Sequence, residues 1–509
     1  MMFRRFLLSA IAAGAIGFGA ATASAAPAKN VILFISDGAS WGTWDMASYW
    51  ATGVQRGQAY ADFPVKLGMT TYPLNTSSTP TFSGTPQISY DPARAWATTP
   101  NGGSFGGRPS YFDGYDYIKR DYADSAAAGT ALATGLKTYN NAINFDDFAN
   151  PLRYITQDAK ALGKSTGAIS SVPFSHATPA SFGAQNVSRN NYHQIAEQML
   201  ANPDLDLIMG AGDPRYNSNG ELRSTPGETY MSVAQLNRLL ANDPVYNRTL
   251  ISSLEEFRAM ADGSAVPAGR VIGLAQTGDT LQATRNRPAD PANISVERGN
   301  ASGVPFNENV PTLVEMTAGA INHLSRNPNG FFLMVEGGAV DWAAHANNTA
   351  RIIEEQVDFD RAVAWAINWV ETYSSWAETL MIVLTDHGNG MPMGPNSDTI
   401  PFQPIEGRGQ GVLPGVRWHY GTHTNENTLF WAKGAGAGLF YSHVVGIDPG
   451  LVQFLGFNDG RYIDNTAVYP VMLRAMSTHD VPEPASAALL LAGLAGLGLA
   501  VRRRQAVPA

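Results

Sequence analysis

The pair Asp124-Ser125 begins a run of small residues, DSAAAGTA, that could do chemistry on an anion. A serine in the first turn of such a helix lies beside backbone N–H groups without a helical partner, in a field that favours negative charge. Because the residues after it are small, a phosphate group can approach the helix there. The structural alternative is a small-residue helix packed tightly in an α/β protein, with Ser125 as its N-cap.

Acids also recur where apolar strands are expected to end. The segments 30–37, 330–336 and 379–386 are continuous apolar runs that end in Asp37, Glu336 and Asp386. Such runs are typical of strands buried on both faces of a parallel sheet. Ligands bind beyond the carboxyl ends of strands in open α/β sheets, so each acid is a candidate ligand. An aspartate in the position of Asp37 is also a common helix cap.

Five further candidate ligands follow expected strands: Thr178, Asp341, His345, His387 and His423. Ionised carboxylates in such places need cations or hydrogen-bond donors. The chain has 34 lysines and arginines against 43 acids and no cysteine, so metal ions are the natural counter-charge. Such ions can use only His, Asp, Glu or hydroxyl ligands. Histidine with carboxylate suits catalytic zinc, and an all-oxygen set suits magnesium.

A large α/β framework must position these residues. With 509 residues, 44% of them apolar, the chain can form one such domain with insertions or two to three smaller ones. Further strands are expected in 162–172, 204–212 and 427–431, and helices in 233–240, 253–260, 312–325 and 349–373. The segment 74–114 reads as mostly loop, and 213–311 as an insertion domain or a set of surface loops. The formal charge of −9, without long runs of one sign, argues against nucleic-acid binding.

The N-terminus reads as an export signal. Arg4 and Arg5 precede an apolar run in 6–21, and Ala23-Ser24-Ala25 supplies small residues for cleavage. Residues 1–25 are therefore expected to direct export, and the alternative is an uncleaved membrane anchor.

The C-terminus carries a second targeting pattern. Val481-Pro482-Glu483-Pro484 precedes the uncharged stretch 485–501, and three arginines, 502–504, close it. The stretch is at the short end for a membrane span, and the arginines would stay on the cytoplasmic side. This order resembles a PEP-CTERM sorting signal, whose family is processed by an exosortase in bacteria with an outer membrane. We expect the tail 479–509 to anchor the protein transiently and then to be cleaved; a plain C-terminal anchor is the alternative.

Five motifs, in order, resemble those of the alkaline phosphatase family over about 29–477. DSAAAGTA resembles the family's nucleophile motif and STGAISSVPFSHATPASFGA its third-metal segment. VEGGAVDWAAH and LTDHG resemble its two zinc segments, and GTHT its final histidine segment. One such motif is a weak signal, but five in the family's order and spacing are a strong one. The resemblance implies a three-layer α/β fold, in which a mostly parallel central sheet has helices on both faces. It also implies a catalytic domain of 26–478 with loop insertions at about 40–119, 213–311 and 392–418.

The resemblance implies three metal sites. It assigns two zinc ions and one magnesium ion, with Asp341, His345 and His423 for the first zinc, Asp37, Asp386 and His387 for the second zinc, and Asp37, Thr178 and Glu336 for magnesium.

The resemblance also assigns the residues that act on substrate. Ser125 would be the nucleophile, and the planar fork of Arg189 would bind two phosphate oxygens. Asp124 would orient that arginine, or it is merely a helix cap. His176 and Trp342 stand where the family varies, so they are candidates for contact with the third metal, through water, or with the substrate.

The function implied is hydrolysis of small-molecule phosphate monoesters through a phosphoseryl intermediate. One alternative is a phosphodiesterase or sulfatase-like relative on the same core, and another is a non-catalytic surface protein whose metals only brace the fold. Arg189 favours a dianionic monoester, because a diester has one fewer charged oxygen. The expected location is the periplasm, the cell surface or the exterior, and assembly as a homodimer is left open.

Overall fold

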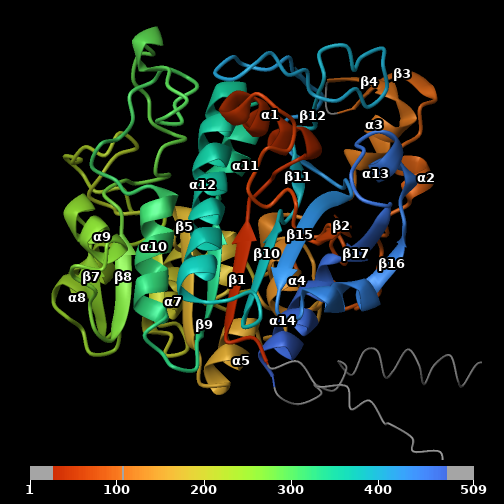
Figure 1. Cartoon of the computed structure of the whole chain (residues 1–509). Coiled ribbons are helices and arrows are strands. Elements are labelled where there is room, and N and C mark those ends of the chain that lie inside the picture. Colours follow the sequence, from red (N-terminus) through yellow and green to blue (C-terminus); the bar gives the residue numbers. More distant parts are fainter. Residues whose placement is uncertain (1–26, 106–107, 478–509) are drawn as a thin grey trace, which may run out of the picture.

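The computed structural model describes residues 27–105 and 108–477 (Figure 1). The strands are β1 (Asn30–Ile35), β2 (Val65–Thr70), β3 (Pro100–Phe105), β4 (Arg108–Phe112), β5 (Ser165–Pro173), β6 (Leu207–Ala211), β7 (Arg248–Ile251), β8 (Arg270–Leu274), β9 (Phe331–Glu336), β10 (Thr379–Leu384), β11 (Gly388–Asn389), β12 (Pro392–Met393), β13 (Arg417–Trp418), β14 (His423–Thr424), β15 (Thr428–Gly434), β16 (Val444–Ile447) and β17 (Arg461–Asp464). The α-helices are α1 (Trp41–Thr52), α2 (Pro92–Ala95), α3 (Asp113–Ile118), α4 (Ser125–Thr134), α5 (Ile155–Ala161), α6 (Ala177–Ser181), α7 (Tyr192–Ala201), α8 (Val233–Leu240), α9 (Leu254–Ala261), α10 (Leu313–Leu324), α11 (Ala339–His345), α12 (Thr349–Tyr373), α13 (Pro449–Gln453) and α14 (Val468–Met476). Short 3₁₀ helices are η1 (Pro291–Asn293), η2 (Ala437–His443) and η3 (Asn465–Ala467).

Within the described ranges, eleven strands form one sheet in the order β16-β17-β2-β15-β10-β1-β9-β5-β6-β8-β7. The run from β10 to β7 is parallel throughout, and antiparallel pairs occur around β15 and at the edge strand β16. The predicted mostly parallel sheet is therefore confirmed.

The sheet is covered on both faces, as its central strand shows. Ile32 and Phe34 of β1 belong to one apolar core, with side chains of α1, α10 and α12. Val31, Leu33 and Ile35 belong to the other core, with side chains of α4, α5, α7 and α14. Successive side chains of a strand point to opposite faces, so a continuous apolar run serves two cores. The three-layer fold is confirmed, and α10 and α12 lie in front of the strands in Figure 1.

Parts of the expected insertions belong to the sheet or form regular structure. β7 and β8, from segment 213–311, extend one edge of the sheet, and β2, from segment 40–119, lies within it. Segment 74–114, expected to be mostly loop, contains α2 and the β3–β4 hairpin. Short apolar runs between turns carry a weak sequence signal, because their neighbours in the sheet are distant in the chain.

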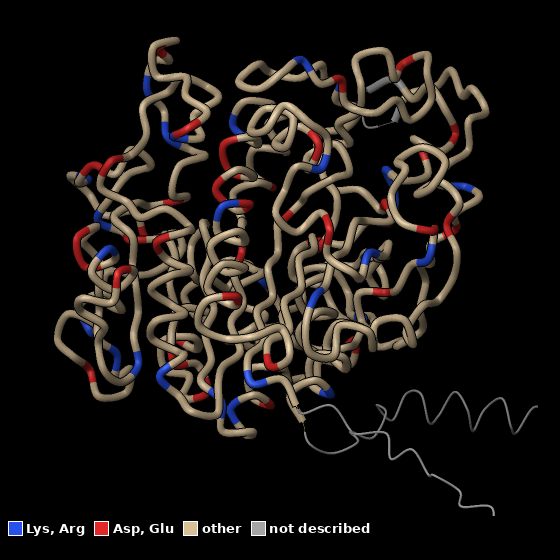
Figure 2. Tube along the Cα trace, in the orientation of Figure 1, with Lys and Arg blue, Asp and Glu red and all other residues tan. Residues whose placement is uncertain are grey.

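The two expected targeting segments, 1–25 and 479–509, lie outside the described residues, as does the expected span 485–501. Within the described residues, no helix combines the length and the apolarity needed to cross a membrane. Acidic and basic residues are interspersed over the trace of the described chain (Figure 2).

Candidate active site

The site lies where three neighbouring strands end. β1 lies between β10 and β9 and is parallel to both, so their carboxyl ends share one edge of the sheet. β9 ends at Glu336, whereas β1 and β10 end shortly before Asp37 and Asp386. The turn after β1 needs a glycine: Gly38 has φ +67°, and a Cβ there would meet Oδ1 of Asp341 at 2.6 Å.

One cluster of candidate ligands contains Asp37, Asp386 and His387, whose ligand atoms all lie within 4.8 Å of one another. Nε2 of His387 lies 3.5 Å from Oδ1 of Asp37 and 3.3 Å from Oδ2 of Asp386. The histidine and both acids are at most 1% exposed. This group coincides with the predicted second zinc set.

A second cluster surrounds Asp341. Nε2 of His423 lies 3.4 Å from Oδ1 of this acid, and Nε2 of His345 lies 3.4 Å from its Oδ2. The two histidine Nε2 atoms are 3.2 Å apart. Asp341 and His423 also form a compact ligand group with His387, which places the two clusters side by side. His345 is 40% exposed and lies at the solvent side.

The predicted magnesium ligands meet on the other side of Asp37. Oγ1 of Thr178 donates to its Oδ2 over 3.3 Å, so the two oxygens of Asp37 face different neighbours. Glu336 accepts a hydrogen bond from Ser170 through Oε2, and its Oε1 has no partner among the described residues.

Three acids of this site, Asp37, Glu336 and Asp386, lack a positively charged side chain as partner, whereas Asp341 has His423. Burial raises the pKa of Asp37 well above its usual value, and the charges of Asp386 and Asp341 raise it further. Burial raises the pKa of Glu336 to about 7 and that of Asp386 to about 6. Burial alone would also raise the pKa of Asp341, but His423 holds it well below its usual value. Burial also lowers the pKa of His387 well below its usual range.

Metal ions fit this donor set. Three fully buried carboxylate oxygens, Oδ1 of Asp37, Oδ2 of Asp386 and Oε1 of Glu336, have no hydrogen-bond partner in the described chain. A buried ionised carboxylate is costly unless a cation or donors compensate it. Carboxylate oxygens with imidazole nitrogens are the ligands that zinc takes, and Asp37, Glu336 and Thr178 supply an all-oxygen set.

Ser125 is the first residue of α4 and is 1% exposed. Its Oγ lies 3.2 Å from Nε2 of His387. Asp124, rather than Ser125, is the N-cap, since its Oδ1 accepts the N–H of Ala127 over 3.0 Å. The serine hydroxyl is therefore not used for capping and faces the ligand cluster.

Asp124 also pairs with Arg189, which follows it by 65 residues in the chain. Nη1 of Arg189 donates to Oδ2 of Asp124 over 3.0 Å, and Nη2 lies 3.4 Å from Nε2 of His176. Burial and the charge of Arg189 lower the pKa of His176 to about 3, so the imidazole is neutral and accepts from the guanidinium. The capping and orienting roles predicted for Asp124 are thus compatible, because they use different oxygens.

A groove of about 540 Å³ leads to the site, and Arg189, Asp341 and His345 are among its lining residues. Trp342 packs edge-on against His176 with ring centroids 5.7 Å apart. On the other side, Tyr122 packs edge-on against His423 at 5.9 Å. Every residue predicted for the site lies in this groove or in the buried cluster beneath it.

Sequence reasoning missed four residues that support the site. Asn389 donates to Oδ1 of Asp341 over 2.6 Å, and Ser170 donates to Glu336. Glu426 accepts the N–H of Trp41 at the start of α1, directly after the turn at Gly38. Tyr122 lines the mouth of the groove. A local signal could have found three of them: Asn389 follows the LTDHG motif, Glu426 follows GTHT, and Ser170 lies inside the segment STGAISSVPFSHATPASFGA.

The comparisons with known proteins agree with this geometry. The family model "Alkaline phosphatase" matches residues 115–405, and the model of the PEP-CTERM protein-sorting motif matches residues 480–504. Alkaline phosphatase 4 of Bacillus subtilis is 32% identical over 272 residues, which are 52% of this chain and 49% of that protein. The alkaline phosphatase of Escherichia coli K12 is 32% identical over 295 residues, 53% of this chain and 59% of that protein. The chain thus spans about half the length of the curated relatives it matches.

Two solved structures share the fold over most of the chain. The alkaline phosphatase of the Antarctic bacterium TAB5 superimposes with a TM-score of 0.55 at 22% identity, covering 89% of this chain and 99% of that chain. A cold-active alkaline phosphatase of Shewanella sp. gives a TM-score of 0.58 at 22% identity, covering 88% of this chain and 100% of that chain. The family model covers more than half of the sequence, and its span includes the Asp-Ser helix and the strands that end at Glu336 and Asp386. This chain belongs to the alkaline phosphatase family.

Proposed function

We propose that this protein hydrolyses phosphate monoesters, with Ser125 as the nucleophile that carries a phosphoseryl intermediate. The observation that carries the proposal is the position of Ser125 Oγ. It is buried at the start of α4, 3.2 Å from Nε2 of His387, beside a cluster of carboxylates that lack cations. Arg189, held by Asp124 over 3.0 Å, stands at the same groove.

The proposal includes two zinc ions and one magnesium ion. Their ligands would be Asp341, His345 and His423 for the first zinc, Asp37, Asp386 and His387 for the second, and Asp37, Thr178 and Glu336 for magnesium. When bound, the ions lower the pKa of a hydroxyl or water ligand and offset the charge on the oxygens that enter and leave. Solved mutants of the TAB5 enzyme in which glutamate or aspartate replaces a histidine have Mg bound in the M3 site, which supports an acid-rich oxygen set as a magnesium site by analogy.

The chain's own residues bind and orient the phosphate. The N–H groups in the first turn of α4 face anions, and small side chains leave the approach open. Arg189 donates through its planar fork to two phosphate oxygens, while Asp124 and His176 fix its plane. The Oγ–P bond forms as the bond between phosphorus and the alcohol oxygen breaks, and water then cleaves the Oγ–P bond to release phosphate.

Arg189 supports a monoester over the alternatives. A monoester dianion presents two charged oxygens to the guanidinium fork, whereas a diester presents one fewer. In a non-catalytic protein, nothing would require a serine beside the ligand cluster whose hydroxyl does not cap the helix.

An activity panel tests the proposal. We expect p-nitrophenyl phosphate to be hydrolysed with zinc and magnesium present, and its bis ester and sulfate analogues to be poor substrates. Ser125→Ala should lower turnover about 10⁴-fold and abolish covalent labelling by phosphate, with melting temperature and metal content unchanged. Phosphate trapped on α4 in this variant would contradict the nucleophile. A preference for the bis ester or the sulfate would favour the corresponding relative.

The sorting-motif match supports export and surface sorting, with processing of the tail by an exosortase-type enzyme. We infer that residues 1–25 are removed on export and that the tail 479–509 anchors the protein only until cleavage. Mass spectrometry of the protein from its host should find neither segment. A membrane fraction that retains Ala509 would instead indicate a simple anchor. The homodimer left open above remains untested.

A further inference from the structure

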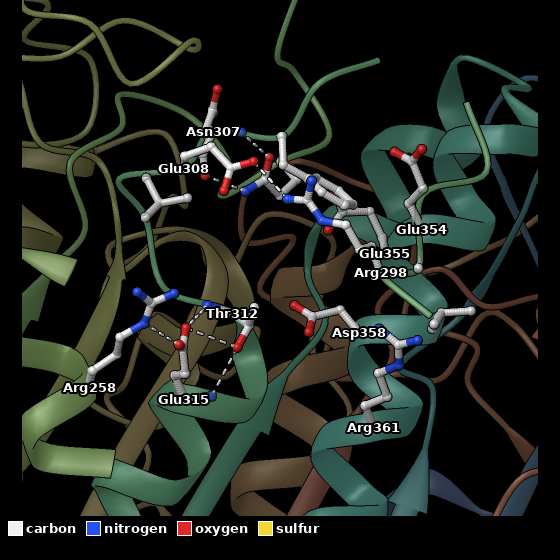
Figure 3. Close-up of a pocket in the computed structure, with 15 residues that line it drawn as sticks. Arg258, Arg298, Asn307, Glu308, Thr312, Glu315, Glu354, Glu355, Asp358 and Arg361 are labelled. Carbon is white, nitrogen blue, oxygen red and sulfur yellow. Dashed lines mark hydrogen bonds and ion pairs between the residues drawn. The ribbon is translucent and has the colours of Figure 1, made fainter. Parts of the chain in front are cut away.

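A pocket of about 190 Å³ lies between α12, the start of α10 and the loop that precedes α10. We call it the α12 pocket. Figure 3 shows the pair Arg258 and Glu315 on one side of it and Asp358 and Arg361 of α12 on the other. None of its lining residues belongs to the groove that leads to Ser125.

Most charged groups of this pocket already have partners. Arg258 donates to Glu315 over 2.8 Å, and Arg298 donates to Glu308 over 2.7 Å. Arg361 donates to the backbone carbonyls of Val296 and Glu297, both over 2.8 Å. Because these charged groups already have partners, none of them needs a ligand to compensate its charge.

Glu354, at the back of the pocket, is also compensated. Its Oε2 accepts from Arg285 over 2.8 Å and from Arg351 over 3.0 Å, and its Oε1 accepts the N–H of Ser302 over 2.7 Å.

Glu355 is different. It lines the pocket and is 5% exposed, and its Oε1 is buried without a partner among the described residues. Asp358 lies one turn further along α12 and uses Oδ2 to accept the N–H of Leu313 over 2.9 Å. Burial raises the pKa of Glu355 to about 8, and the charge of Asp358 raises it further. Burial likewise raises the pKa of Asp358 to about 6. Arg285 and Arg351 offset the rise at Glu355 only in part, and Arg361 does the same at Asp358. Neither acid therefore has an ion pair of its own among the described residues.

The rest of the pocket has an apolar wall, formed by Phe306, Val310 and Val357. Val310 and Val357 are at most 5% exposed. A pocket with apolar walls and a few polar groups at one point is typical of a site for a small organic molecule.

We propose that the α12 pocket binds a small primary amine with an apolar body. Glu355 and Asp358 hold its ammonium group, and the apolar wall receives its body. An ammonium group has three N–H donors and one positive charge, so it can donate to the carboxylate oxygens of two acids that line one pocket and have no ion pair of their own.

A hard divalent cation suits the site less well. Calcium takes six to eight oxygen ligands, whereas the other carboxylates and amides of this pocket are already hydrogen-bonded. The apolar wall would also stay unused by a bare ion. The proposal does not depend on phosphatase activity, because binding is measured directly.

Isothermal calorimetry with 2-phenylethylamine tests the proposal on the metal-loaded, mature protein, with inorganic phosphate present to occupy the catalytic groove. We expect one amine per chain, with affinity at least about tenfold above that of 2-phenylethanol, which has the same body without the charge. Glu355→Gln and Asp358→Asn should each weaken amine binding about tenfold or more. Glu371→Gln is the matched control: this acid also lies on α12 but does not line the pocket and is 53% exposed, so the affinity should not change.

Each of the following results would overturn the proposal. The wild type could fail to bind the amine, or bind the alcohol equally well. Folded Glu355→Gln protein, checked by circular dichroism, could bind the amine as the wild type does. Calcium binding that requires Glu355, without amine binding, would assign the pocket to a metal. If both variants unfold, a crystal structure of the wild type with 2-phenylethylamine decides: the amine nitrogen should lie within hydrogen-bonding distance of Glu355, and an amine bound elsewhere contradicts the site.

Discussion

Glu336 and Glu354 are both buried glutamates, 0% and 4% exposed, but their surroundings differ. Glu354 receives three hydrogen bonds, two of them from the arginines Arg285 and Arg351. Glu336 receives one from Ser170, and its other oxygen has no partner among the described residues. Arginine side chains thus compensate the charge of Glu354, whereas the charge of Glu336, which is buried to a similar extent, is left to an external cation. The difference separates a structural acid from a candidate ligand.

Removal of the metal ions should have the largest effect on activity and stability. It should act on the catalytic site and leave the surroundings of Glu354 unchanged. Chelation should abolish hydrolysis of p-nitrophenyl phosphate, because Asp37, Glu336 and Asp386 then lose their counter-charge. Stability should fall by about 4 kcal/mol for each site that a cation fills at 1,000 times its Kd. Activity and melting temperature are measured before chelation, after it, and after zinc and magnesium are restored. Full activity in protein that mass spectrometry shows to be free of metal would contradict this account.

Loss of the ion pair between Arg285 and Glu354 should lower the stability of the fold but not the activity. Arg285→Met leaves Glu354 with one of its two arginines, and the loss of one partner of a buried pair typically costs about 3–5 kcal/mol. Urea unfolding measures the loss, and activity per folded molecule and metal content should stay unchanged.

The double variant Arg285→Met/Glu354→Leu is the control for that cost. It also removes Glu354, which is only partly compensated without Arg285, so much of the lost stability should return. If Arg285→Met instead releases zinc, the two regions are coupled and the distinction between them fails.

A smaller effect is expected from changes at Arg189, whose guanidinium is proposed to bind the substrate phosphate. Arg189→Ala should raise the inhibition constant of phosphate about 10- to 100-fold, because charge-assisted hydrogen bonds to two oxygens are lost. Arg189→Lys should recover only part of the affinity, since a point charge cannot bind two oxygens in one plane. Zinc content should not change in either variant, and an unchanged inhibition constant would count against the role of Arg189.

The smallest effect should appear at Glu355, which has no ion pair among the described residues and whose charge Arg285 and Arg351 offset only in part. Burial raises its pKa from 4.5 to about 8, so the folded state loses stability relative to the unfolded state as pH rises through that interval. Glu355→Gln removes the titrating group and should be more stable than the wild type by about 1–3 kcal/mol at pH 8 but not at pH 4. Urea unfolding at both pH values, without amine, measures the difference. Parallel pH profiles for both proteins would show that Glu355 does not titrate in this range.

The motifs around Asp37, Glu336 and Asp386 mark strand ends, and this position is the physical basis of the predicted ligand set. In parallel strands, apolar runs that end in Asp37, Glu336 and Asp386 bring these acids to one edge whatever the intervening chain does. The three-layer fold follows from the same runs, which alternate between two cores. β7 and β8 were harder to predict as strands, because a short apolar run becomes a strand only where the edge of a sheet is available to pair with it.

The sequence by itself therefore determined which apolar runs end in candidate ligands, where the Asp-Ser helix starts and the targeting pattern at each terminus. Only the tertiary structure decided how the ligands are shared. It brings Arg189 to Asp124 across 65 residues and places His387 between Asp37 and Asp386. It also separates two adjacent glutamates that the sequence cannot distinguish: Glu354 meets Arg285, which is 69 residues away in the chain, whereas Glu355 faces a pocket. Compensation of a buried charge depends on contacts between distant segments, and no local pattern encodes those contacts.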